Sequence, residues 1–249
     1  MAKLKRITIL GESPLVEEYA SLCHNKGLEI SVRLNAGFAQ SGIAKGYRKL
    51  TKVQKSADIG LELTNVSLDV KRSNLIELDG TLAQGAVILS SSLTVSVSEQ
   101  ASWISHPQKL VGIGALPTLL ESGMVEIAPS FATDARSLNI VKEFGKTLGR
   151  EMAEVRDSVG LVLPRILCML TNEACFAMME HVASAHDIDT AMKLGTNYPR
   201  GPVQWAEKIG PRQVYAVVAA LHRFFGEERY RPSPFLQFAA SRNTFFANP

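Results

Sequence analysis

The sequence lacks an apolar run long enough to cross a membrane, and it has few cysteines and little net charge. The amino terminus also lacks the apolar core of a signal peptide, so we expect a cytoplasmic protein without a membrane-spanning helix. The formal charge is only +3 and the basic residues are scattered, which argues against nucleic-acid binding. The three cysteines, Cys23, Cys168 and Cys175, have no metal-ligand spacing, so we expect reduced apolar side chains and no metal site.

A long helical segment dominates the second half of the chain, which has 249 residues, 46% of them apolar and 20% charged. Apolar residues recur at helical spacing from Leu161 to Val182, and they predict a helix with little surface facing water. Such a helix lies at the centre of a domain or between two subunits. Asp187 and Asp189 then predict the start of a following helix, which Gly195 ends.

The first half alternates short apolar strands with helices. A strand ending at Leu10, a turn at Gly11, a helix over 14–26 and a second strand with the sequence LEISVRL open a doubly wound nucleotide-binding sheet. Further strands are expected over 57–62, 85–89, 110–114, 123–127 and 151–155, with a helix around Leu68–Leu75 and an amphipathic helix over 134–149. The sequence therefore predicts an α/β Rossmann-like domain over 1–155, followed by an all-helical domain over 156–249.

The first turn departs from a dinucleotide-binding fingerprint. That fingerprint needs three glycines, whereas GESPLVEE keeps only Gly11, with Ser13 at the second position and Val16 at the third. Glu12 and Glu17 add negative charge at the helix amino terminus that would hold a pyrophosphate. We therefore favour a structural βαβ unit with little dinucleotide affinity.

The end of the second strand offers a basic residue instead of an acidic one. It reads Arg33-Leu34-Asn35, without the carboxylate that holds an adenosine ribose. Arg33 is the alternative contact, to a phosphorylated ribose, so NAD and NADP are both candidate cofactors whose binding these residues argue against. The basic run GIAKGYRKLTKVQK, residues 42–55, is interpreted as a solvated helix face, with a phosphate-bearing ligand as the minority interpretation.

The run DIDTAMKLGTNYPRGP, with Asp157-Ser-Val-Gly160 before it and Arg231-Pro-Ser-Pro234 after it, resembles the carboxy-terminal domain of the 3-hydroxyacyl-CoA (3-hydroxybutyryl-CoA) dehydrogenases. The resemblance extends over almost the whole chain, more weakly before about residue 80. It implies a Rossmann-like domain, a 6-phosphogluconate-dehydrogenase-like helical domain that pairs into a homodimer, and an oxidoreductase of fatty acid metabolism. Too few residues separate Asn35 from Ala57 for the helical hairpin with which the family holds much of its CoA.

The resemblance also implies where catalytic residues would lie. The family uses a histidine oriented by a glutamate, with a serine and an asparagine binding the substrate oxygen. The histidine position falls on Gly114, the glutamate position on Glu126 and the asparagine position on Pro164. The serine position falls on Leu93, with Ser92 adjacent. Glycine accepts no proton and a proline side chain cannot hydrogen-bond a carbonyl.

Lys71 matches a family lysine near the nicotinamide, and a surface lysine on a helix is the equal alternative. None of the five histidines is an obvious replacement for the missing base. The candidate residues are Glu126 and Ser92 for catalysis, and Gly11, Ser13, Arg33 and Lys71 for cofactor binding.

Three functions stay open. The favoured one is a divergent member of the resembled family that lacks standard hydride transfer and acts as a binding or partner subunit. The second is an active NAD(P)-dependent 3-hydroxyacyl-CoA dehydrogenase, or a related oxidoreductase, with a site rebuilt around Ser92 and Glu126. The third is another reaction on the same scaffold, with an acyl or nucleotide ligand between the two domains.

Overall fold

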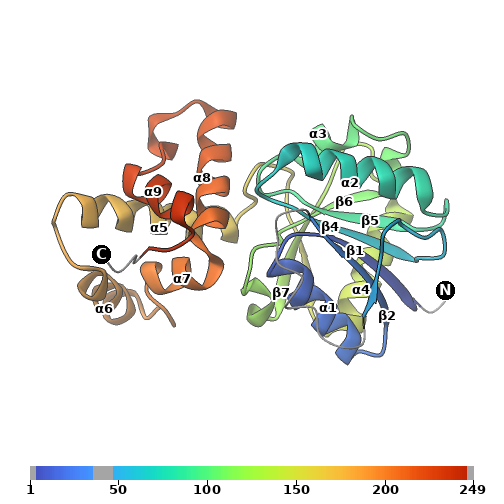
Figure 1. The fold of residues 1–249 in the computed structure, drawn as a ribbon, viewed down its shortest axis with the longest axis horizontal. Coiled ribbons are helices and arrows are strands. Elements are labelled where there is room, and N and C mark those ends of the chain that lie inside the picture. Colours follow the sequence, from blue (N-terminus) through green and yellow to red (C-terminus); the bar gives the residue numbers. More distant parts are fainter. Residues whose placement is uncertain (1–3, 36–46, 246–249) are drawn as a thin grey trace. The chain divides into compact units, whose positions relative to one another are not determined.

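A computed structural model describes residues 4–35 and 47–245, and it divides the chain into two compact units, Met1–Leu161 and Val162–Pro249 (Figure 1). The first unit is an α/β sheet domain and the second is helical. The fold class expected from the sequence is therefore confirmed. The division falls a few residues after the boundary expected at residue 155.

The described residues of the first unit form one eight-stranded sheet in the order β3-β2-β1-β4-β5-β6-β7-β8. The strands are β1 (Arg6–Gly11), β2 (Glu29–Leu34), β3 (Arg48–Lys49), β4 (Ile59–Leu63), β5 (Val87–Ser91), β6 (Leu110–Ile113), β7 (Met124–Pro129) and β8 (Glu151–Glu154). Neighbouring strands are parallel except β6 and β7, which are antiparallel. The chain runs outward from β1 to β2 and returns to β4 on the other side of β1. The switch point, where ligands bind in open α/β sheets, therefore lies between β1 and β4.

Helices cover both faces of this sheet (Figure 1). They are α1 (Leu15–Asn25), α2 (Leu68–Thr81), α3 (Val97–Ala101) and α4 (Ala135–Leu148), with short 3-10 turns at Pro107–Lys109 and Leu119–Ser122. Ile7 and Ile9 alternate along β1 with Thr8, and the two isoleucines join a core built with α1 and α4. The α2 helix packs on the other face, where Leu78 lies against Gly60 of β4.

The basic run differs from its predicted form. The run begins at residue 42, and its first residues, like all of 36–46, lie outside the described residues. Its described part, 47–55, is not helical: Arg48 and Lys49 form β3, which pairs with β2, and the remainder is irregular. The interpretation of these residues as a solvated helix face is therefore wrong.

The second unit contains α5 (Leu163–Met179), α6 (Ala185–Thr196), α7 (Pro202–Ile209), α8 (Pro211–Phe225), a 3-10 turn at Glu228–Tyr230 and α9 (Pro234–Arg242). The long helix is α5, which packs against α7, α8 and α9. It ends earlier than predicted, and Ile166 and Met179 are 49% and 38% exposed in the single chain. The expectation that little of this helix faces water therefore does not hold for one chain alone.

The two aspartates of the DIDTAMKLG run do not cap the helix that contains them. Ser184 caps α6, where its hydroxyl accepts a hydrogen bond from the Asp187 N–H at 3.2 Å. The buried Asp189 carboxylate instead accepts from the Val203 and Gln204 N–H groups, at 2.9 and 3.1 Å, at the start of α7. A Cβ at Gly201 would lie 2.1 Å from an Asp189 oxygen, so this contact requires glycine there. Within the described residues, no helix has both the length and the apolar character needed to cross a membrane.

Candidate functional site

The carboxyl ends of β1 and β4 meet at the switch point of the sheet. Gly11 ends β1, and a Cβ at this residue would lie 2.6 Å from the carbonyl oxygen of Leu63, the last residue of β4. The next amide, the Glu12 N–H, donates to the same carbonyl at 3.2 Å. Gly11 is therefore required by the close approach of two strands, whether or not a ligand binds there.

The Glu12 carboxylate occupies this switch point. Its side chain is fully buried, and one carboxylate oxygen accepts from the N–H groups of Asn65 and Val66 at 2.8 and 3.2 Å. These two amides lie in the loop between β4 and α2. Backbone N–H groups at such a position favour an anion, and here the chain supplies its own anion. The sequence signal was a glutamate directly after the glycine that ends the first strand, and only its charge was used.

The start of α1 is also acidic. No side chain caps the helix, and Ser13 precedes it without reaching an α1 amide. Glu17 and Glu18 lie in the first turn. Burial raises the pKa of Glu18, and the Thr118 N–H groups that donate to its carboxylate at 3.0–3.1 Å oppose this rise. A pyrophosphate at this helix end would meet carboxylates in place of the two missing glycines.

Arg33 is held by protein groups. Its guanidinium donates to both carboxylate oxygens of Glu77 at 3.0 and 2.6 Å, and to the Asn74 side chain at 3.2 Å. Burial raises the pKa of Glu77, but the contacts from Arg33 outweigh burial and leave the pKa below its ordinary value. Asn35 donates to Thr64 at 2.9 Å and accepts from Asn74 at 3.1 Å. The residues at the ribose position therefore bond to α2 and β4.

Lys71 is a buried structural cation, and its interpretation as a surface lysine is wrong. Its side chain is 0% exposed and its ammonium group forms an ion pair with the equally buried Glu62 carboxylate of β4. It also donates to the Ser90 hydroxyl of β5 at 3.2 Å, and Asn74 donates to Glu62 at 3.3 Å. Together with the Arg33–Glu77 pair, these contacts join β2, β4, β5 and α2 through polar groups under the sheet.

Gly114 and Glu126 lie beside each other, as the spacing predicted. The Gly114 N–H donates to the Glu126 carbonyl at 2.8 Å. A Cβ at residue 114 would point at the Glu126 Cβ, 3.3 Å away, with a Leu161 methyl group at 3.4 Å. Glu126 is 6% exposed. The carboxylate is therefore placed to orient a side chain at residue 114, where none exists.

Ser92 lies two residues along the same edge. Its buried hydroxyl would lie 2.6 Å from a Cβ at Gly112, and it has no hydrogen-bond partner among the described residues. Residues 112 and 114 point to the same side of an extended strand, so Ser92 and Glu126 lie on one face at the end of β6. The structure thus brings the two catalytic candidates to one region, apart from Arg33 and Lys71.

No histidine replaces the side chain missing at residue 114. His106 pairs with Asp79 at 3.2 Å, but it precedes β6 and so lies at the opposite end of that strand from Gly114. Burial raises the pKa of Asp79, and the Ser105 N–H and Lys109 outweigh burial and leave the pKa below its ordinary value. Across residues 4–35 and 47–245, no group of three or more His, Cys, Asp or Glu side chains could hold a metal ion.

The residues at the pyrophosphate position do not fit a dinucleotide bound in the glycine-rich manner. Glu12 fills the switch point, and Arg33 and Lys71 are tied into ion pairs. Of the four residues expected to bind a cofactor, only Gly11 and Ser13 lie at that loop.

Two family models match consecutive parts of the chain. One, described as 3-hydroxyacyl-CoA dehydrogenase, NAD binding domain, matches residues 35–158, and the other, the C-terminal domain of the same enzyme, matches 160–245. The first match begins after the β1–α1 turn. The part of the Rossmann unit that carries Glu12 therefore lies outside it.

Curated relatives and solved structures agree with these models. The chain is 31% identical over 179 residues to a 3-hydroxybutyryl-CoA dehydrogenase of Bradyrhizobium diazoefficiens, covering 72% of this chain and 61% of that one. It is 32% identical to a 3-hydroxyadipyl-CoA dehydrogenase of Escherichia coli, covering 75% and 34%. The chain thus spans less than two thirds of these relatives' length. An (S)-3-hydroxybutyryl-CoA dehydrogenase structure from Ralstonia eutropha shares the fold, with a TM-score of 0.80, 24% identity and coverage of 99% and 100%.

Replacing Lys71 tests whether it is a structural cation. Lys71→Met leaves the Glu62 carboxylate buried without its ion-pair partner, which should lower the free energy of unfolding by about 3–5 kcal/mol. The double variant Glu62→Gln/Lys71→Met should recover part of this loss, because it removes the unpaired charge. The matched control is Lys142→Met, since Lys142 pairs with Glu154 at 2.9 Å on the surface and its loss should cost about 1 kcal/mol or less. Urea unfolding measures all three variants, and a Lys71→Met loss no larger than that of Lys142→Met would contradict the assignment.

Proposed function

Because the chain belongs to the 3-hydroxyacyl-CoA dehydrogenase family, we propose that it binds an acyl thioester of the kind this family handles, without carrying out the family's hydride transfer. The observation that carries the proposal is the pair Gly114 and Glu126. The carboxylate that would orient a base is in place, but residue 114 has no side chain to orient.

Proton transfer is the step that this geometry disfavours. When a secondary alcohol is oxidised, a base must take the hydroxyl proton as the hydride leaves. Glycine at 114 takes no proton, and Pro164, the second residue of α5, offers no hydrogen bond to a carbonyl oxygen. A standard site of this family would need both functions.

Cofactor binding is the second difficulty for hydride transfer. The Asn65 and Val66 amides at the switch point already bind the Glu12 carboxylate, and the first turn of α1 carries Glu17 and Glu18. A pyrophosphate would have to displace one carboxylate and lie beside others. Coulomb repulsion and the loss of the Glu12 hydrogen bonds both oppose this.

The second candidate is an active NAD(P)-dependent oxidoreductase with a rebuilt site. The dehydrogenase names of the relatives favour it, and so does Glu126, which lies at the position of the missing base. In this candidate the Glu126 carboxylate itself accepts the hydroxyl proton and the unpartnered Ser92 hydroxyl binds the substrate oxygen.

Turnover and binding measurements distinguish the two candidates. With acetoacetyl-CoA and either NADH or NADPH, we expect no loss of absorbance at 340 nm above the protein-free rate, while calorimetry detects saturable binding of acetoacetyl-CoA. Turnover that falls by about 100-fold or more in Glu126→Gln, but not in the exposed control Glu151→Gln, would contradict the first candidate and support the second. Absence of both turnover and acyl-CoA binding would contradict both.

We propose further that the helical unit pairs two copies of the chain. Large apolar side chains remain exposed on and beside α5 and α6: Ile166 at 49%, Val182 at 72% and Leu194 at 84%. Such exposure favours burial against a partner. Light scattering should give twice the chain mass for the wild type and a smaller mass for Leu194→Glu. A monomeric wild type at every concentration tested would contradict the dimer.

A further inference from the structure

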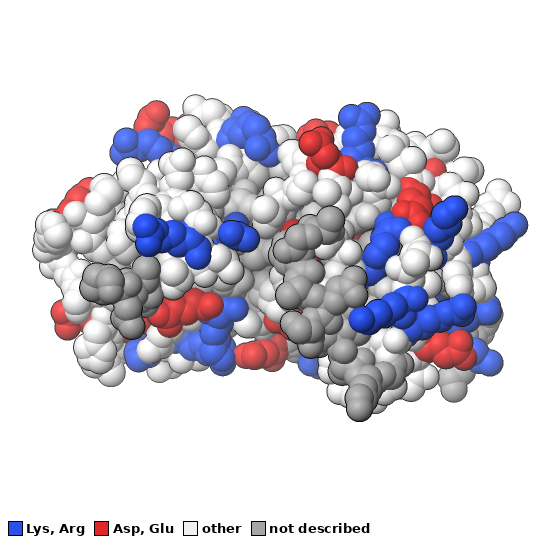
Figure 2. All heavy atoms as spheres, in the orientation of Figure 1, with Lys and Arg blue, Asp and Glu red and all other residues white. Residues whose placement is uncertain are grey.

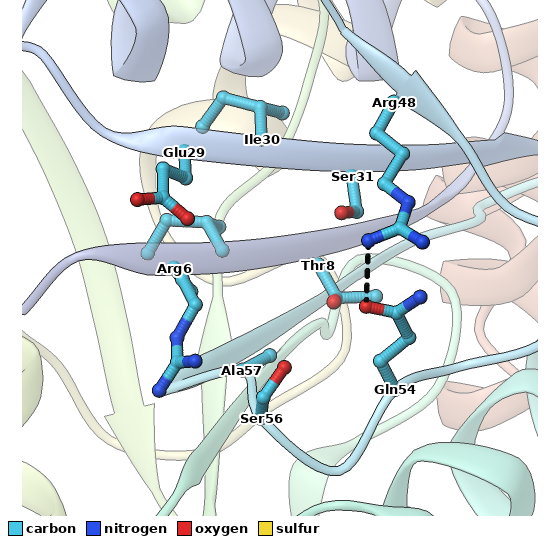
Figure 3. Close-up of a pocket in the computed structure, with 10 residues that line it drawn as sticks. Arg6, Thr8, Glu29, Ile30, Ser31, Arg48, Gln54, Ser56 and Ala57 are labelled. Atoms are coloured by element: carbon cyan, nitrogen blue, oxygen red, sulfur yellow. Dashed lines mark hydrogen bonds between the residues drawn. The ribbon is translucent and has the colours of Figure 1, made fainter.

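A polar cavity opens on the sheet of the first unit, away from the carboxyl edge. It has a volume of about 360 Å³ and is lined by the first half of β1, the first half of β2, β3, and the segment that leads into β4 (Figure 3). Ligand sites of open α/β sheets lie at the carboxyl ends of the strands, and this cavity lies toward the amino ends. Its volume is in the range of small-molecule sites.

The cavity floor is a row of polar side chains across three strands. Thr8 of β1 pairs in register with Ser31 of β2, which pairs with Arg48 of β3. One step earlier, Arg6 pairs in register with Glu29, and residues two apart on a strand point to the same face. Thr8 is 2% exposed although it is polar. A sheet face built to be covered by a helix would carry apolar residues at these positions.

The opposite wall supplies further hydrogen-bonding groups. Gln54, Ser56 and Ala57 line it, and Arg48 donates to the Gln54 side chain at 3.2 Å across the cavity, as the dashed line in Figure 3 shows. The Gln54 carbonyl thus fixes one guanidinium nitrogen of Arg48. The remaining N–H groups of that guanidinium are left to contact a ligand.

The charge around the cavity favours an anion. No acidic side chain of the described residues forms an ion pair with Arg6 or Arg48, and the nearby Asp58 carboxylate accepts from the backbone N–H groups of Lys5 and Arg6, both at 2.9 Å. Glu29 is the single acidic residue of the lining. Exposed lysines of the same segment, Lys49, Lys52 and Lys55, add positive charge, and Figure 2 shows blue side chains gathered over this end of the first unit.

We propose that this cavity binds a small phosphate-bearing molecule, with Arg6 and Arg48 contacting the phosphoryl oxygens and Thr8 and Ser31 donating from the floor. Two guanidinium groups and neighbouring hydroxyls are the donors that proteins use for phosphate. The Glu29 carboxylate at the cavity edge then accepts from a hydroxyl or amine elsewhere on the same molecule. This site does not depend on the proposed function, because none of its residues lies at the carboxyl edge.

Calorimetric titration of the whole chain at constant ionic strength tests the site, with inorganic phosphate, pyrophosphate and AMP as probes. We expect saturable binding of at least one probe, weakened about tenfold or more by Arg48→Gln and by Arg6→Gln. The matched control is Lys52→Gln, which removes the same charge from an exposed residue outside the lining and should leave the affinity within about twofold.

The three probes also distinguish the source of the phosphate. Tighter binding of AMP than of inorganic phosphate would assign the site to a phosphorylated organic molecule, and equal or tighter binding of inorganic phosphate would assign it to the free ion. Two results would overturn the proposal: no saturable binding of any probe, or an equal loss of affinity in Lys52→Gln and Arg48→Gln, which would indicate general charge attraction. Thermal unfolding of each variant without probe confirms that it is folded.

Discussion

The buried carboxylate of Glu12 constrains the carboxyl edge of the sheet. It joins the ends of β1 and β4 by accepting from two backbone amides of the following loop. Those amides would be costly to leave unbonded in a buried position, so the glutamate stabilises the loop in its present form. The same contact places a fixed negative charge where open α/β sheets usually receive a ligand. One side chain thus supports the fold and disfavours an anionic cofactor.

A second set of polar contacts holds the other face of the same strands. Lys71, Glu62 and Asn74 form a buried network that reaches Arg33 and Glu77 at its outer end. Ion pairs of this kind contribute little net stability, but they tolerate few arrangements, because every partner must be satisfied. They fix α2 against β4 and β5, and they use the cations that a dinucleotide phosphate would otherwise attract.

Much of the fold followed from the sequence, because strand and helix periods and the glycine-ended turns are local properties. The Gly114–Glu126 pairing was also predicted, since a fixed spacing within one hairpin sets the register. The partners of Lys71, Arg33 and Glu12 were not predictable, because each contact joins residues that are 9 to 54 positions apart and come together only in the packed sheet. The interpretation of residues 42–55 as a helix face failed because two residues paired with β2, a tertiary contact that overrides local preference.

Titration of the purified chain with NADH by calorimetry tests the central claim most directly, because it measures cofactor binding separately from catalysis. The account predicts no saturable binding with a dissociation constant below about 1 mM, which corresponds to about −4.1 kcal/mol. One-site binding with a micromolar dissociation constant would contradict it. That result would mean that the dinucleotide displaces the Glu12 carboxylate or binds elsewhere on the sheet edge, and that the chain retains the cofactor of its family.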